Sequence, residues 1–230
     1  MQETTKYLCE NIQGCVLGYT QSDEITLILV DYQKLTSSAW FDYEVQKLCS
    51  ISASMATMAF NKYFAENIAN EILEYKTSMV PQCVEIQQEI KEYHDTLRAA
   101  VNKGAMFDAR CFNIPKEEVT NLIYWRQLDA ARNSVQMVGQ ANFSHKELQN
   151  KSCNMIQDML HEQKGINWND FPVDCKRGAA VIKKKIGTNI AAACGIAGAT
   201  YENRWVIDRN MPILKGEDRA YVDDLVYIGE

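Results

Sequence analysis

CVLGYTQSDEITLILV, residues 15–30, carries the strongest structural signal in this sequence. Residues 15–20 have β-branched and aromatic character, and residues 25–30 are almost continuously apolar, as expected for two strands. A short polar stretch, residues 21–24, separates them, which predicts a β-hairpin. The turn of this hairpin holds two adjacent acids, Asp23 and Glu24.

Adjacent carboxylates beside a hydrophobic strand are costly unless water, a cation or basic side chains balance them. Mg²⁺ suits such a position because it takes oxygen ligands and retains bound water. An exposed acidic turn without any ion is the simpler explanation, and the chemistry of Asp23 and Glu24 alone favours it.

The rest of the chain mixes helices with a few short strands. Residues 115–135 are expected to form a helix on which Arg126, Asp129 and Asn133 share one face, either as a solvated helical ion pair or as a binding surface. The pattern as a whole indicates an α+β domain. The other expected elements are helices at 2–12, 42–70 and 84–101 and strands at 106–114, 181–186 and 204–207.

Composition excludes several classes of protein. The 230 residues are 47% hydrophobic and 23% charged, which is ordinary for a globular chain. No apolar run is long enough to span a bilayer and the first residues are polar, so we expect a cytoplasmic protein that does not bind membranes. The eight cysteines are scattered without zinc spacing, which favours reduced and mostly buried thiols.

The formal net charge of −6 is unusual for a nucleic-acid binder. Basic residues nevertheless cluster between residues 176 and 185, either as a solvated face or as a phosphate contact. The GxxxxGK phosphate loop, the GxGxxG dinucleotide fingerprint and the GxSxG elbow are all absent from the sequence.

Four ordered motifs resemble one known family. They are QSDEIT at 21–26, FDARCFNIP at 107–115, WRQLD at 125–129 followed by RNS at 132–134, and GINWND at 165–170 followed by KRG at 176–178. Together they resemble the tRNA(His) guanylyltransferase-like family of reverse-direction (3′–5′) nucleotidyltransferases. Ala131 stands where the strict histidine-tRNA enzymes have the histidine of a HINN sequence, which resembles the branch that repairs truncated tRNA 5′ ends.

The resemblance implies a polymerase-palm-like, ferredoxin-like antiparallel sheet with flanking helices, followed by a C-terminal helical and basic region. It implies a nucleotidyltransferase that adds GTP-derived G, or a template-matched nucleotide, to the 5′ end of tRNA after activation by ATP, with two Mg²⁺ ions. Residues 1–115 would be the catalytic domain, and residues 116–230 would bind tRNA and nucleotide. Such proteins tend to form dimers or tetramers, and the helix at 84–101 either makes such an interface or packs within its own chain.

The resemblance also carries roles over to particular residues. Asp23 and Glu24 would be catalytic and would bind the metal ions. Ser22, Lys47 and Asn133 would bind nucleotide. The expected tRNA-binding residues are Arg126, Asp129, Arg132, Asn167, Lys176 and Arg177.

Relatives carry a strand with a metal-binding Asp before the first helix of this chain, so we expect that strand to be absent here. Its absence would leave two strands of the palm without a neighbour. The alternative functions are therefore a catalytically inactive tRNA-binding remnant or a split subunit. Within enzymes, a nucleotide cyclase is the alternative.

Overall fold

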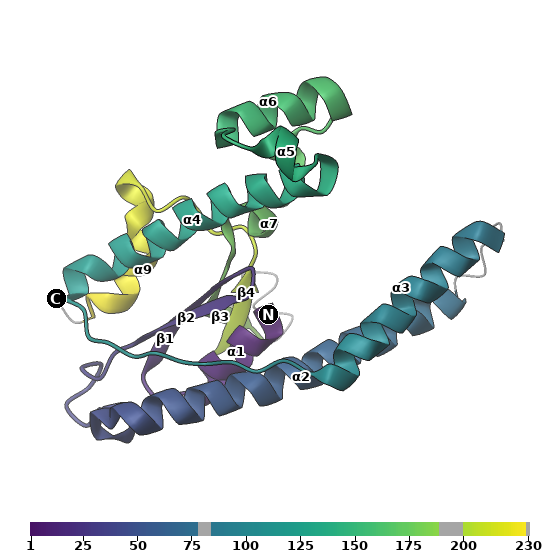
Figure 1. The fold of residues 1–230 in the computed structure, drawn as a ribbon. Coiled ribbons are helices and arrows are strands. Elements are labelled where there is room, and N and C mark those ends of the chain that lie inside the picture. Colours follow the sequence, from purple (N-terminus) through teal and green to yellow (C-terminus); the bar gives the residue numbers. More distant parts are fainter. Residues whose placement is uncertain (78–83, 189–199, 229–230) are drawn as a thin grey trace. The chain divides into compact units, whose positions relative to one another are not determined.

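The computed structural model describes residues 1–77, 84–188 and 200–228. The chain forms two compact units (Figure 1). The first combines Met1–Trp40 with Phe112–Glu230, and the second is Phe41–Cys111. The functional division into residues 1–115 and 116–230 stays a prediction.

The first unit contains a four-stranded antiparallel sheet in the order β2-β1-β3-β4. β1 (Cys15–Gln21) and β2 (Glu24–Leu29) form the predicted hairpin. The two short strands expected near the C-terminus are confirmed and longer than predicted, as β3 (Ala179–Gly187) and β4 (Tyr201–Asp208). The predicted α+β class with an antiparallel sheet is therefore confirmed.

The predicted strand at 106–114 is wrong. Residues 104–115 have no regular secondary structure. Their backbone groups bond instead to side chains of α2 (Val45–Thr77). Asn61 bonds to both the N–H and the carbonyl of Ala105, and Thr57 Oγ1 accepts from Phe107 N at 3.0 Å. β1 pairs with β2 on one side and, over residues 17–20, with β3 on the other, so the middle of β1 has a strand partner along both edges.

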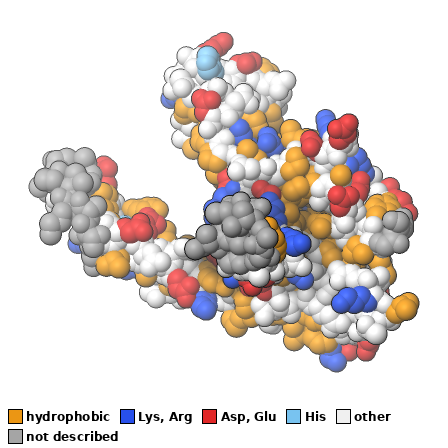
Figure 2. All heavy atoms as spheres, turned by 180° about the vertical axis from the view of Figure 1, so that it is seen from behind, with side chains coloured by type: hydrophobic (Ala, Val, Ile, Leu, Met, Phe, Trp, Pro, Cys, Tyr) orange, Lys and Arg blue, Asp and Glu red, His pale blue; other side chains and the backbone are white. Residues whose placement is uncertain are grey.

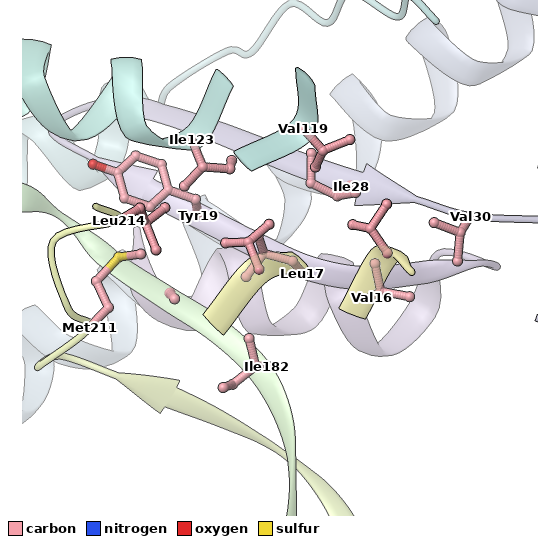
Figure 3. Close-up of a cluster of buried hydrophobic side chains, with 13 residues drawn as sticks. Val16, Leu17, Tyr19, Ile28, Val30, Val119, Ile123, Ile182, Met211 and Leu214 are labelled. Atoms are coloured by element: carbon pink, nitrogen blue, oxygen red, sulfur yellow. The ribbon is translucent and has the colours of Figure 1, made fainter. Parts of the chain in front are cut away.

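Helices cover both faces of the sheet (Figure 1). α1 (Gln2–Asn11) packs on one face, and a Cβ at Gly18 of β1 would lie 2.4 Å from Cys9 Sγ, so this close approach requires glycine. On the other face lie α4 (Lys116–Asn142) and α9 (Ala220–Val226). Figure 3 shows the apolar core between them, built from Leu17, Ile28, Val119, Ile123, Ile182, Met211 and Leu214 among others.

A smaller apolar cluster joins the C-terminal half of α4 to α6 (Cys153–Lys164), with Val135 and Leu160 at its centre. Between the two helices lies α5 (His145–Leu148), which begins at a capping box formed by Ser144 and Glu147. Gly165 ends α6 in the left-handed conformation. The remaining short elements of the first unit are 3-10 helices at Trp168–Asp170 and Gly216–Arg219 and the helix α7 (Val173–Arg177).

The second unit is a pair of helices, α2 (Val45–Thr77) and α3 (Val84–Lys103), preceded by a 3-10 helix at Trp40–Tyr43. In α2 the buried positions include Ala56, Ala59 and Ile68. None of the helices in the described parts of the chain is long and apolar enough to cross a membrane.

The expectation of mostly buried cysteines is wrong for the described residues. Only Cys9 and Cys15 are buried among the six described thiols, and Cys175 is exposed. Cys83 and Cys194 lie outside the described residues.

Candidate active site

The acidic hairpin turn is built from two residues, Ser22 and Asp23, between paired positions Gln21 and Glu24. Ser22 has φ 48°, the left-handed conformation that tight two-residue hairpins require. Ser22, Asp23 and Glu24 are all exposed, whereas Gln21 is buried. The turn thus presents three of the predicted catalytic and nucleotide-binding residues at the tip of the hairpin.

Side chains from two elements hold the Glu24 carboxylate. Gln21 Nε2 donates to Glu24 Oε2 at 3.1 Å from the neighbouring strand. Arg126 Nη1, on α4, donates to the same oxygen at 2.9 Å. Both partners of this ion pair are partly exposed, so the pair fixes the orientation of Glu24 more than it stabilises the fold.

The predicted polar face of α4 forms beside this turn. Asn133 Nδ2 donates to Asp129 Oδ2 at 3.1 Å, one helical turn beyond Arg126. Burial raises the pKa of Tyr19, Arg126 opposes that rise, and the charges of Asp129 and Glu24 add to it. The buried Tyr19 hydroxyl therefore interacts electrostatically with Glu24, Arg126 and Asp129, so all three charged groups lie near it.

Tyr19 is a residue that the sequence reasoning missed. Its hydroxyl donates to the carbonyl of Arg177 at 2.5 Å and so joins β1 to the KRG segment. The alternation of a strand could have indicated Tyr19, because Tyr19 and Gln21 share one face of the strand and Gln21 pairs with Glu24. Tyr19 therefore points to the same side of the sheet as the acidic turn.

Gly178 allows the KRG segment to approach β1. It has φ 79°, and a Cβ there would lie 2.6 Å from the Thr20 carbonyl and 2.7 Å from the Tyr19 hydroxyl. Both the backbone conformation and the lack of space require glycine. The Nε of Arg177 is buried and has no hydrogen-bond partner within the described residues.

Lys176 and Asn167 have internal partners in this structure. Lys176 is buried, and its ammonium donates to the Asn169 carbonyl at 2.5 Å and lies 5.4 Å from the centre of the Trp168 ring. Asn167 caps the 3-10 helix that contains Trp168 and donates to Asp170 Oδ1 at 3.2 Å. Trp168 Nε1 in turn donates to Ser134 on α4 at 3.1 Å. The GINWND and KRG motifs thus form one structural unit against α4.

The two remaining predicted residues lie elsewhere. Arg132 is exposed on α4. Lys47 belongs to the second unit, on α2, where its ammonium is 3.0 Å from Glu44 and 5.9 Å from the centre of the Phe41 ring. The first unit therefore brings together the turn and the polar face of α4, and the roles of all predicted site residues stay predictions.

The acidic turn fits a magnesium ion that is shared with a substrate. Within the described ranges, no three His, Cys, Asp or Glu side chains converge to form a complete metal cage. Mg²⁺ is usually held by only one or two carboxylates together with water and substrate phosphates. Asp23 and Glu24 are adjacent carboxylates, and the hydrogen bonds from Gln21 and Arg126 both end on Oε2 of Glu24.

A family model described as Thg1, tRNAHis guanylyltransferase, matches residues 1–115 of the chain. A solved bacterial tRNA(His) guanylyltransferase (Thg1)-like protein in complex with ATP is 38% identical, with a TM-score of 0.70, over 99% of this chain and 77% of that one. A bacterial Thg1-like protein in complex with GTP is 34% identical, with a TM-score of 0.65, over 98% of this chain and 76% of that one.

A more distant solved structure shares the fold, and a viral protein is similar in sequence. The tRNA(His) guanylyltransferase from Saccharomyces cerevisiae is 20% identical, with a TM-score of 0.52, over 78% of this chain and 70% of that one. Uncharacterized protein R259 of Acanthamoeba polyphaga mimivirus is 29% identical over 186 residues. That match covers 76% of this chain and 58% of the viral protein, so the chain spans less than two thirds of that relative.

Proposed function

Because the chain belongs to the tRNAHis guanylyltransferase (Thg1) family, we propose that it is a nucleotidyltransferase that adds nucleotides to the 5′ end of tRNA. The observation that carries this proposal is the Glu24 carboxylate, held by Gln21 and Arg126 beside the exposed Asp23 at the hairpin turn. The similarity to bacterial proteins in complex with ATP and with GTP supports nucleoside triphosphates as substrates.

The proposed reaction has two phosphoryl transfers. First, a 5′-monophosphate oxygen of the tRNA attacks the α-phosphorus of ATP, and pyrophosphate leaves. Next, the 3′-hydroxyl of GTP, or of a template-matched nucleotide, loses its proton and attacks the activated 5′ phosphorus. AMP then leaves, and a new phosphodiester bond joins the added nucleotide to the tRNA.

Positioning and charge are the contributions of the protein to such a reaction. Asp23 and Glu24 would hold Mg²⁺, which neutralises phosphate charge and lowers the pKa of the attacking hydroxyl. Gln21 and Arg126 fix Glu24 Oε2, which keeps Oε1 directed away from them. Ser22 lies within the same turn, where its hydroxyl can donate to a phosphate oxygen.

The polar face of α4 is the proposed continuation of the site. Asn133 and Asp129 bond to each other and lie on the same face as Arg126, so they can meet a nucleotide or the end of the tRNA beside the acidic turn. Lys47 and Arg132 are proposed to bind phosphate as cations. Asn167, Lys176 and Arg177 are proposed to shape the tRNA-binding surface through the unit that they form against α4.

The test uses the full chain and a 5′-monophosphorylated tRNA that lacks its first nucleotide. Incubation with ATP, Mg²⁺ and each labelled nucleoside triphosphate should give incorporation that matches the template base. Asp23→Ala should abolish incorporation, while Asp95→Ala, which changes an exposed acid in the second unit, should not change it.

Two other outcomes would overturn the proposal. Incorporation that survives Asp23→Ala would remove the acidic turn from the reaction. Tight tRNA binding without any incorporation, at all Mg²⁺ concentrations, would identify a tRNA-binding protein without catalysis. Light scattering on the same sample gives the oligomeric state, for which we propose a dimer or tetramer.

A further inference from the structure

Strands β3 and β4 extend beyond the rest of the sheet as a two-stranded ribbon. β1 pairs only with residues 179–182 of β3. Beyond them, residues 183–187 of β3 have residues 201–205 of β4 as their strand partners within the described parts of the chain. Nearly all residues of this ribbon are exposed, with Trp205 half-buried. The ribbon therefore presents both of its faces to the surroundings.

The two faces of the ribbon differ in charge. Paired residues of antiparallel strands share a face, and successive residues alternate between faces. One face, which we call the lysine face, consists of Lys183, Lys185, Tyr201, Asn203 and Trp205 and contains no acid. On the opposite face, Lys184 lies 2.8 Å from Asp208, and Arg204 pairs with Glu202. Only the lysine face therefore keeps its positive charge without a carboxylate partner on the ribbon.

Both lysines of the lysine face lie over aromatic rings. Lys183 Nζ is 5.0 Å from the centre of the Trp205 ring, and Lys185 Nζ is 5.2 Å from the centre of the Tyr201 ring. Such contacts hold an ammonium group in place without neutralising it. Figure 2 shows one face of the molecule, on which Lys and Arg side chains lie among acidic, hydrophobic and uncharged ones. The two charges are thus ordered along one strand.

The lysine face lies on the same side of the sheet as α1. Gly18, whose Cβ position points at α1, pairs with Val181, and Lys183 follows two residues later. Tyr19 pairs with Ala180 and therefore belongs to the opposite side, with the acidic turn. The lysine face is therefore separate from the candidate active site.

We propose that the lysine face binds the phosphate backbone of the RNA substrate at a point away from its 5′ end. Alternate residues of a strand are about 6.6–6.8 Å apart, so two ammonium groups can meet phosphates along one RNA strand. The rings of Trp205 and Tyr201 are already covered by lysines, which favours phosphate contacts over base stacking. This inference rests on the proposed function, because it takes tRNA as the partner.

The test measures tRNA affinity against salt concentration. For each variant, the logarithm of the binding constant is plotted against the logarithm of the KCl concentration. Lys183→Ala combined with Lys185→Ala should weaken binding and reduce the slope by about 1.4–1.8, because each lost phosphate contact contributes about 0.7–0.9. The matched control, Lys184→Ala combined with Arg204→Ala, removes the same charge from the opposite face and should leave the slope close to that of the wild type.

Equal slopes for the lysine-face variant and the wild type would overturn the inference. Equal losses in both double variants would do so as well, because they would indicate a general effect of net charge. Addition of a nucleotide to a short acceptor-stem hairpin separates the two proposals, since so small an RNA need not reach the ribbon. If the wild type adds nothing to either RNA, the proposed function fails, whereas the salt slopes still decide whether the lysine face binds RNA.

Discussion

Arg126 Nη1 lies 2.9 Å from Glu24 Oε2 and joins two residues that are 102 positions apart in the chain. The guanidinium comes from α4 and the carboxylate from the first residue of β2. Because α4 is fixed by its packing on the sheet, it positions a charge at the acidic turn that the hairpin could not supply. The pair connects the orientation of Glu24 to the position of α4.

Arg126→Ala is expected to reduce nucleotide addition by about 10- to 100-fold, because a small displacement of a reacting group can have an effect of that size. The free energy of unfolding should change by less than about 1 kcal/mol, since the ion pair is partly exposed. Arg98→Ala is the matched control, because it removes an exposed ion pair with Asp95 in the second unit. Wild-type rates in Arg126→Ala would contradict the positioning role.

Gly178→Ala should destabilise the first unit by more than the roughly 1–2 kcal/mol that a left-handed conformation costs an L-residue. The excess comes from two sources: the backbone of Gly178, whose φ of 79° and ψ of −179° suit almost only glycine, and the carbonyl of Thr20, which would lie 2.6 Å from the new Cβ. Gly165 has a left-handed conformation and a Cβ there meets nothing within 4 Å, so Gly165→Ala measures the cost of a left-handed residue without a close contact. Urea unfolding of both variants measures the loss of unfolding free energy in each. Equal losses would show that the close contact with Thr20 does not add to the cost.

Acid unfolding should report on Asp208. Burial raises the pKa of its carboxyl, but hydrogen bonds from Lys184, the Asn210 N–H and Tyr221 outweigh burial and lower the pKa below its ordinary value. The folded state therefore gains stability that is fully present above the ordinary Asp pKa of about 3.9 and is lost as the pH falls through the folded value.

Asp208→Asn removes this dependence. Its free energy of unfolding should fall less steeply than that of the wild type below about pH 4. Glu147, whose pKa is also lowered by hydrogen bonds from Ser144, is present in both proteins and contributes equally. Parallel curves for the two proteins, measured by urea unfolding at successive pH values, would rule out a stabilising role for the Asp208 carboxylate.

Cys49 and Cys111 should form a disulfide on mild oxidation, because their Sγ atoms are 3.7 Å apart within the second unit. Treatment with a thiol oxidant such as diamide would remove one hydrogen atom from each thiol. Peptide mapping should then find the two cysteines linked. Cys9 and Cys15 are buried and should remain reduced under the same conditions. Preferential oxidation of the buried pair would contradict the arrangement of α2 and Cys111.

Local patterns predicted the hairpin well because its determinants lie next to one another. β-branched and aromatic residues, a polar turn and an apolar run all fall within residues 15–30, and the observed register agrees with them. The strand predicted at 106–114 failed because a strand also needs a neighbour, which local sequence does not reveal. The polar groups of that segment found partners in Thr57 and Asn61 instead.

The candidate site was predicted in part for the same reason. Helical spacing placed Arg126, Asp129 and Asn133 on one face, and the resemblance supplied Asp23 and Glu24. Only the tertiary structure shows that Arg126 reaches Glu24 and that the Tyr19 hydroxyl bonds to the Arg177 carbonyl. Such contacts depend on packing between distant segments, which the periodicity of a local stretch does not reveal.

The sheet order also dictates when this protein can fold during its synthesis. β1 is buried along its whole length, yet its partner β3 is made about 160 residues later. At the usual pace of ribosomes, β1 leaves the ribosome roughly 8–30 s before β3 does. During that interval the nascent chain exposes an apolar strand with one open edge, which favours aggregation. A lower growth temperature or co-expressed chaperones should therefore raise the yield of folded protein more than stabilising substitutions in α2 or α3.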